Sequence, residues 1–207
     1  KLNNLENEVI CKNLAISDKD EDKYFEISNH SNLHKITDKV TSQKVKCKKL
    51  SNLLEEENFD PDFIKMDVEG AEIEVIKGFR DYLNKTSHKM SILFEVHPEE
   101  YSDTRSFNDE LNFLFNIGFK TEFLITAGSK FPNFFKEKGY NSDTFFKSGE
   151  GRFKRYIIND VTNKDVLTSI NNEVVIRHVN NIKEIIKKGR LFSYYKKIVR
   201  GIMLTRN

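Results

Sequence analysis

Four titratable residues stand in two short groups of this sequence. Asp67 and Glu69 follow the mostly apolar residues 63–66, and Glu95 and His97 lie at the end of a second apolar run. A carboxylate can accept a proton or stabilise a positive charge, and an imidazole can exchange a proton near neutral pH. Residue types in this pattern suit acid–base chemistry, so these four residues are the first candidates for a functional site.

Each group is predicted to follow a β-strand. Residues 62–67 end in acids and are followed by Gly70 and helix-forming residues, as at the turn from a buried strand into a helix. Residues 90–96 are apolar almost throughout, which suits a strand covered on both faces. In open α/β sheets, ligands bind outside the carboxyl ends of the strands. We therefore expect the four candidates to lie along one rim of a parallel sheet.

The segments around these strands predict an alternation of helices and strands. Residues 71–83 carry apolar side chains at three- and four-residue steps, as in an amphipathic helix on a sheet. Ser106 and Asp109 form a weak capping box for a second helix, which Gly118 would end, and residues 119–125 alternate as a strand. This order predicts a largely parallel sheet with right-handed crossovers.

The two ends of the chain are less regular. Strands are predicted at 9–16, 24–28 and 44–50, and Ser51 is expected to cap a short helix through Glu57. Residues 127–153 are rich in glycine and aromatic residues and form either an acceptor lid or a local hydrophobic cluster. Residues 155–161 are predicted to form an antiparallel strand that completes the sheet.

Three segments together resemble the FkbM-like methyltransferase family. They are Asp62-Phe63-Ile64-Lys65-Met66-Asp67-Val68-Glu69-Gly70-Ala71-Glu72, Ile76-Lys77-Gly78 and Ile92-Leu93-Phe94-Glu95-Val96-His97-Pro98. The resemblance covers roughly residues 7–126. It implies a Rossmann-like class I α/β fold and methyl transfer from S-adenosylmethionine, usually to an oxygen of a sugar, polyketide or similar small acceptor.

The resemblance also implies roles for individual residues. Ala15 and Ser17 end the strand that would lie beside the adenine of S-adenosylmethionine. Asp67 would meet the methionine end of the cofactor or the acceptor, and Glu69 would face the pocket or cap the following helix. Glu95 reaches a ligand or has a structural partner.

His97 is either a general base or a hydrogen-bonded loop histidine. Asp67, Glu95 and His97 are the predicted catalytic residues. No histidine spacing indicates a metal site, and the family implies no metal.

One part of the family pattern is missing. Such enzymes open with a strand, a glycine-rich turn and a second strand ending in an acid, whereas the first glycine here is Gly70 and the first residue is Lys1. We therefore expect a fragment that lacks the first two strands, with an eroded homologue as the alternative. Such a fragment would be inactive alone and would leave one edge of the strand at 62–67 open.

Composition bounds the remaining possibilities. The 207 residues are 38% hydrophobic and 32% charged, which is typical of a globular domain. We expect a partial methyltransferase domain at 1–178 and a basic helical tail at 179–207. No apolar run approaches the ~18 residues of a membrane span. Cys11 and Cys47 lack metal-ligand spacing, which suits two reduced thiols in the cytoplasm.

The distribution of charge along the chain indicates which kinds of partner the protein could bind. Residues 177–207 contain nine lysines and arginines against the single acid Glu184, although the net charge of the chain is only +2. Such a segment either favours an anionic membrane surface or forms a solvated helix docked on the domain. No nucleic-acid partner is expected, because few aromatic residues interleave with the basic ones. The rival function is a non-catalytic binding module for a glycan, an anionic membrane surface or a protein.

Overall fold

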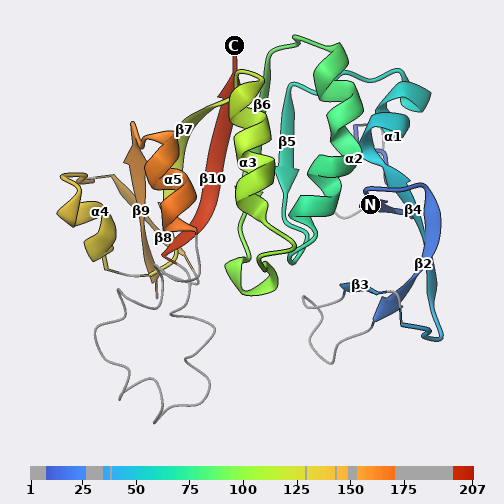
Figure 1. Cartoon of the computed structure of the whole chain (residues 1–207), viewed down its shortest axis with the longest axis horizontal. Coiled ribbons are helices and arrows are strands. Elements are labelled where there is room, and N and C mark those ends of the chain that lie inside the picture. Colours follow the sequence, from blue (N-terminus) through green and yellow to red (C-terminus); the bar gives the residue numbers. More distant parts are fainter. Residues whose placement is uncertain are drawn as a thin grey trace.

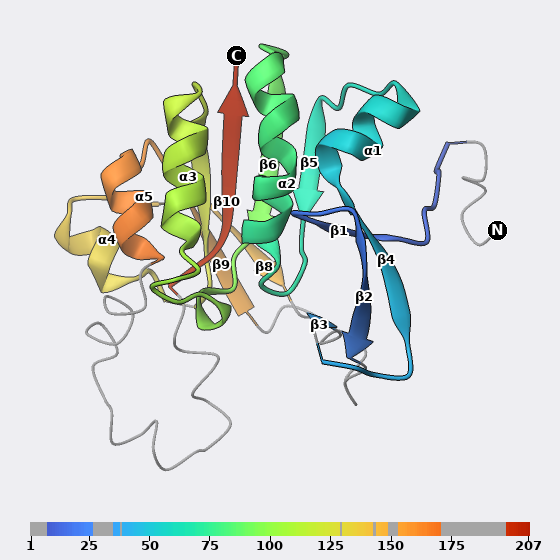
Figure 2. The same ribbon diagram turned by 45° about the vertical axis from the view of Figure 1, so that its right-hand side comes forward.

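The chain folds into a mixed α/β structure with two β-sheets (Figure 1). The computed structural model describes residues 8–26, 35–37, 39–128, 130–142, 144–148, 153–170 and 198–207. Figure 2 shows the smaller sheet beside helix α2 (Glu72–Lys85), at the side of the molecule away from the larger sheet's later strands.

The larger sheet has six strands in the order β5-β6-β10-β7-β9-β8. β5 pairs in parallel with β6, and every later pair in this order is antiparallel. The strands are β5 (Phe63–Met66), β6 (Met90–Glu95), β7 (Lys120–Thr126), β8 (Phe145–Ser148), β9 (Phe153–Asn159) and β10 (Val199–Arg206).

Helices cover the larger sheet and form its core with it (Figure 1). α2 buries Ile73, Ile76 and Phe79 completely, which confirms the predicted amphipathic helix. α3 (Phe107–Asn116) begins as predicted, because the Ser106 hydroxyl accepts a hydrogen bond from the Asp109 amide. The remaining helices are α4 (Asn133–Glu137), α5 (Asn163–Ser169) and the short 3-10 helix η1 (Pro98–Glu100).

The smaller sheet has the order β1-β4-β2-β3 and is followed in the chain by α1 (Leu50–Glu57). β1 pairs in parallel with β4, whereas β2 is antiparallel to both of its neighbours. Its strands are β1 (Ala15–Ser17), β2 (Glu21–Glu26), β3 (Lys35–Thr37) and β4 (Lys44–Lys49).

The prediction of one mostly parallel sheet is wrong. Among the described strands only β5–β6 and β1–β4 are parallel pairs. β6 and β7 run in the same direction, but β10 lies between them and is antiparallel to both. β9 does form the antiparallel strand expected near residues 155–161, although β10 is the one that enters the centre of the sheet.

The predicted helical tail at 179–207 is wrong for its last residues, because Val199–Arg206 form β10. Arg206 is buried and donates hydrogen bonds to the carbonyl oxygens of Leu83 and His88. The positive charge of Arg206 therefore lies inside the domain and not on a solvent-exposed tail. The helix expected at 180–198 falls almost wholly outside the described residues, as do seven of the nine basic residues behind the proposed membrane contact.

Residues 127–153 are not one long loop, because they contain α4 and β8. Phe134 and Phe135 are buried, and the Tyr140 ring meets Phe135 edge-on with centroids 5.9 Å apart. These residues form the hydrophobic cluster rather than the lid, since packing against the core fixes them. Phe145 and Phe146 on β8 are instead exposed.

Two local predictions near the N-terminus also differ from the structure. The strand expected at 9–16 is confined to Ala15–Ser17. Ser51 lies inside α1, after the N-cap residue Lys49, and its hydroxyl accepts a hydrogen bond from the Tyr82 amide. Ser51 thus joins α1 to α2 instead of capping a helix.

β5 is an edge strand of the larger sheet, and β6 is its only hydrogen-bonded neighbour in the part of the chain that the structure describes. Phe63 at its start is 52% exposed. The expected open edge is confirmed for these residues, and self-association through it stays a prediction. No helix in the described parts of the chain is both long and apolar enough to span a membrane.

Gly78 allows α2 to approach the end of β1. A Cβ atom at this position would lie 2.1 Å from the backbone oxygen of Ser17. We expect Gly78→Ala to lower the free energy of unfolding by about 1–3 kcal/mol, because overpacking forces the backbone to shift. Urea unfolding measures the change. Gly128→Ala is the control, since its Cβ would meet nothing closer than 3.9 Å; equal stability of both variants would contradict the argument.

Candidate active site

Two parallel strands bring the predicted catalytic residues together. β5 and β6 are in register, with Met66 opposite Phe94, so Asp67 and Glu95 follow at the same edge of the sheet. One side-chain oxygen or nitrogen atom from each of Asp67, Glu95 and His97 lies within 4.8 Å of the others. The expectation of a common rim is confirmed for these three residues.

Glu69 joins the same rim through a tight turn. Glu69 and Gly70 both have positive φ, +48° and +96°, so the chain turns sharply between β5 and α2. An Oε2 atom of Glu69 lies 3.5 Å from Nε2 of His97. The N-cap of α2 is Ala71, so Glu69 does not occupy the capping position that was its alternative role.

His97 is held by a buried carboxylate. Oε1 of Glu72 lies 2.7 Å from Nδ1 of His97, and Glu72 has no exposed surface. The Tyr101 hydroxyl donates a hydrogen bond to Oε2 of Glu72, and the Gly70 amide donates to Oε1. Because the carboxylate accepts a hydrogen bond, we assign the imidazole proton to Nδ1. Nε2 lies on the side of Glu69 and the rim.

No pattern in the sequence indicated the role of Glu72. It lies in the first turn of an amphipathic helix, on the side predicted to be polar. An acid in this place is favoured by the helix dipole whatever its function. Glu72 differs from an ordinary helix acid because it is buried. This burial is seen only in the structure, where His97 lies against Glu72 just after β6. Tyr101, whose hydroxyl also accepts from the His97 amide, was missed for the same reason.

Two cations already contact the rim. Nζ of Lys65 lies 3.1 Å from Asp67, and Arg200 of β10 lies 2.6 Å from Oε1 of Glu95. Glu95 therefore has a structural partner, which was one of its two predicted roles. Lys65 is 60% exposed, so its pair with Asp67 is screened by solvent.

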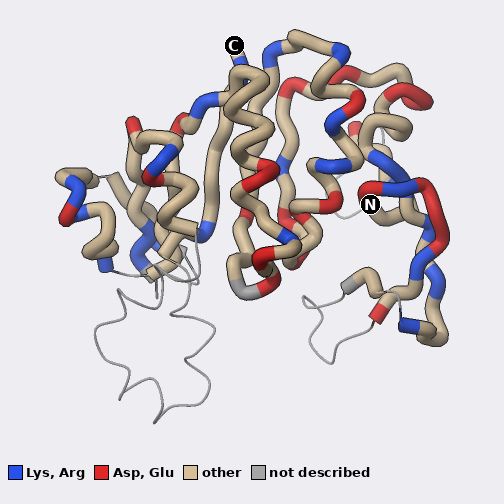
Figure 3. The backbone as a smooth tube through the Cα atoms, in the orientation of Figure 1, with Lys and Arg blue, Asp and Glu red and all other residues tan. Residues whose placement is uncertain are grey.

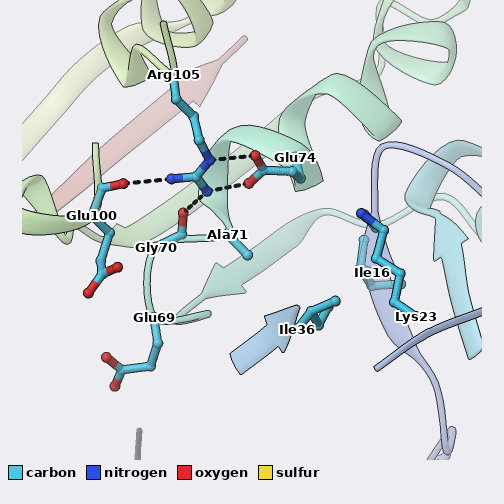
Figure 4. A pocket seen from close by; sticks show the side chains of 10 residues that line it. Ile16, Lys23, Ile36, Glu69, Gly70, Ala71, Glu74, Glu100 and Arg105 are labelled. Atoms are coloured by element: carbon cyan, nitrogen blue, oxygen red, sulfur yellow. Dashed lines mark hydrogen bonds and ion pairs between the residues drawn. The ribbon is translucent and has the colours of Figure 1, made fainter. Parts of the chain in front are cut away.

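A pocket of about 290 Å³ lies next to the rim (Figure 4). Ser17 and Glu69 line it, and their roles in cofactor binding stay a prediction. Ala15 is not among its lining residues and pairs with Cys47 inside the smaller sheet. The lining residues are Ile16, Ser17, Lys23, Ile36, Glu69, Gly70, Ala71, Glu74, Glu100 and Arg105.

Arg105 holds one wall of this pocket in place. Its guanidinium contacts both carboxylate oxygens of Glu74 and the carbonyl oxygens of Gly70 and Glu100, at 2.6–2.7 Å (Figure 4). The hydrogen bonds to Glu74 raise the pKa of Arg105 above its usual value. The arginine thus ties the turn after β5 to α2 and to the segment after β6.

Acidic residues gather where β5 and β6 end and α2 begins (Figure 3). Asp67, Glu69, Glu72 and Glu95 all lie within this region, and His97 contacts two of them. A positively charged ligand group would be attracted here. The site combines such a region with an imidazole lone pair.

A mixed α/β domain with acids and a histidine at the carboxyl ends of parallel strands has the layout of a ligand-binding α/β enzyme. The family model described as "Methyltransferase FkbM domain" matches residues 2–121, which is more than half of the chain. The chain belongs to this family, so the resemblance is confirmed and methyltransferase activity in general is indicated. No match was found among curated proteins or among solved structures.

Proposed function

We propose that this domain transfers a methyl group from S-adenosylmethionine to a hydroxyl oxygen of a sugar, polyketide or similar small acceptor. The observation that carries the proposal is the His97 imidazole, fixed by the buried Glu72 and directed at a rim of acids. Family membership supports the reaction class.

The residues of the pocket fit the donor. Ile16 and Ile36 offer apolar surface for a purine ring, and the Ser17 hydroxyl lies beside them. S-adenosylmethionine supplies a methyl group on a positively charged sulfur. Asp67 and Glu69 supply negative charge on the side of the pocket nearest the rim, and this favours binding of a cation.

His97 acts on the acceptor side. Its Nε2 would take the proton of the acceptor hydroxyl as the oxygen bonds to the methyl carbon and the bond from that carbon to the donor sulfur breaks, so that a neutral thioether leaves. The resulting imidazolium would be stabilised by Glu72 and Glu69. The remaining task is alignment, which can supply ~7–11 kcal/mol of the barrier in favourable cases. The turn fixed by Arg105 serves this alignment by holding Gly70 and Glu74 together.

Donor binding tests the assignment of Asp67. We expect Asp67→Asn to weaken binding of S-adenosylmethionine about tenfold, since an interaction with a charged group contributes roughly 1.5–3 kcal/mol. Calorimetry, with a methyl-transfer assay on a panel of hydroxylated acceptors, measures both steps.

The control for this test is Asp62→Asn. Asp62 is an exposed acid that contacts His88 and precedes the first residue of β5, at the opposite end of the strand from Asp67. This variant should bind the donor as the unchanged protein does. Unchanged affinity in Asp67→Asn would remove the assignment, and absence of methyl transfer to every acceptor would contradict the proposed function.

A further inference from the structure

We infer that Asp67, Glu95 and His97 form a binding site for one divalent metal ion of the Mn²⁺ or Zn²⁺ type. The three side chains come from two adjacent parallel strands, and their donor atoms lie within 4.8 Å of one another. Two ligand atoms on opposite sides of one ion are about 4.2 Å apart at ordinary bond lengths. Small side-chain rotations therefore complete the site.

The donor set selects the class of ion. Carboxylate oxygens suit Mg²⁺, Ca²⁺ and Mn²⁺, whereas an imidazole nitrogen suits the transition metals and Zn²⁺. Two carboxylates with one imidazole satisfy both preferences only for ions such as Mn²⁺ and Zn²⁺. Three ligands from the protein would leave coordination positions for water or an acceptor oxygen.

Independent support comes from the partner of His97. The imidazole is 4% exposed, and Glu72 contacts its Nδ1 from a fully buried position. Metal-binding histidines donate their other ring N–H in this way, which fixes the ring and raises the basicity of the coordinating nitrogen. The arrangement fixes the ring beside Asp67 and Glu95, with Nε2 3.5 Å from Oε2 of Glu69.

The charges of the site match a divalent cation. Four carboxylates, Asp67, Glu69, Glu72 and Glu95, gather around His97, and Lys65 and Arg200 each contact one of them. Lys65 and Arg200 each contact one oxygen of their acid, so the other oxygen can coordinate the ion.

Binding of the ion would change how the acceptor is activated. The Nε2 lone pair would then serve the metal, and the ion would lower the pKa of a coordinated hydroxyl as a Lewis acid. This catalytic role rests on the proposed function. The metal site itself does not, because its ligands and their spacing are independent of the donor and the acceptor.

The test is a titration of the chain with Mn²⁺ in the absence of donor. Calorimetry should show saturation at one ion per chain, and Mn²⁺ should broaden the imidazole resonances of His97 in NMR spectra more than those of His88. Asp67→Asn and Glu95→Gln should each weaken binding at least tenfold. Asp62→Asn is the matched control, since it removes a carboxylate from the surface pair with His88.

Each outcome decides the inference. Absence of saturation at millimolar Mn²⁺, or equal weakening by Asp62→Asn, would overturn it. If a variant fails to fold, the broadening of His97 in the unchanged chain decides alone. Mn²⁺ binding without methyl transfer by the complete protein would keep the site and contradict the proposed function. Methyl transfer by a chain that binds no Mn²⁺ would contradict the metal site and keep the proposed function.

Discussion

His97→Ala is expected to lower the rate of methyl transfer by about 10²–10⁴-fold, which is the usual contribution of a positioned general base. The variant removes the nitrogen lone pair that faces Glu69, Asp67 and Glu95. Donor affinity should change little, because in the proposed mechanism His97 acts on the proton of the acceptor and not on the donor. Steady-state kinetics with saturating acceptor, together with donor calorimetry, separates the two effects.

His88→Ala provides the matched control for this experiment. His88 also contacts a carboxylate, Asp62, at 3.1 Å, but it precedes β6 and lies at the opposite end of that strand from the rim. Its removal should leave the rate unchanged. A His97→Ala variant with an undiminished rate would exclude the imidazole from catalysis, and a loss of donor affinity equal to the loss of rate would make it a donor-binding residue.

The rim was predictable because its signals are local. Residues 63–66 and 90–95 are short apolar runs with acids at their carboxyl ends, and the helix between them has a clear apolar face. A helix between two strands makes them parallel neighbours, so their ends must meet at one edge. The register of Met66 with Phe94 then follows, and with it the proximity of Asp67 to Glu95.

β10 was not predictable from its residues because its place depends on distant partners. Val199–Arg206 contains the apolar run Ile202-Met203-Leu204, but it ends a segment rich in lysine and arginine, which indicated a surface helix. Arg206 is buried because it donates hydrogen bonds to the carbonyl groups of Leu83 and His88 and its guanidinium lies over the ring of Phe119. None of these contacts is close in sequence.

The same limit explains the missed and misassigned parts of the site. Glu72, Tyr101 and Arg105 act through contacts that span four to 35 residues, and each residue type is ordinary at its position in the sequence. The expectation that no histidine spacing indicates a metal is untested, and it was based on neighbours along the chain. Asp67 and His97 are brought together by strand pairing instead.

Glu72→Gln is expected to lower the rate of methyl transfer by about 10–100-fold, the usual effect of losing a carboxylate that orients a functional histidine. The glutamine amide oxygen can still accept the hydrogen bond from Nδ1, so the fold should be kept. The negative charge that favours protonated His97 is lost, and the acidic limb of the pH–rate profile should therefore move to lower pH.

The pH profile is the decisive measurement for Glu72, because a purely structural role would lower the rate without moving the limb. Glu110→Gln supplies the matched control. Glu110 is another buried acid, 1% exposed, and it pairs with Arg80 between α2 and α3 rather than with the rim. Burial raises the pKa of Glu110, so this variant should alter stability and leave the limb in place. If the acidic limb of the pH–rate profile stays in place in Glu72→Gln, Glu72 has only a packing role. If the limb moves, the carboxylate of Glu72 acts on the protonation of His97.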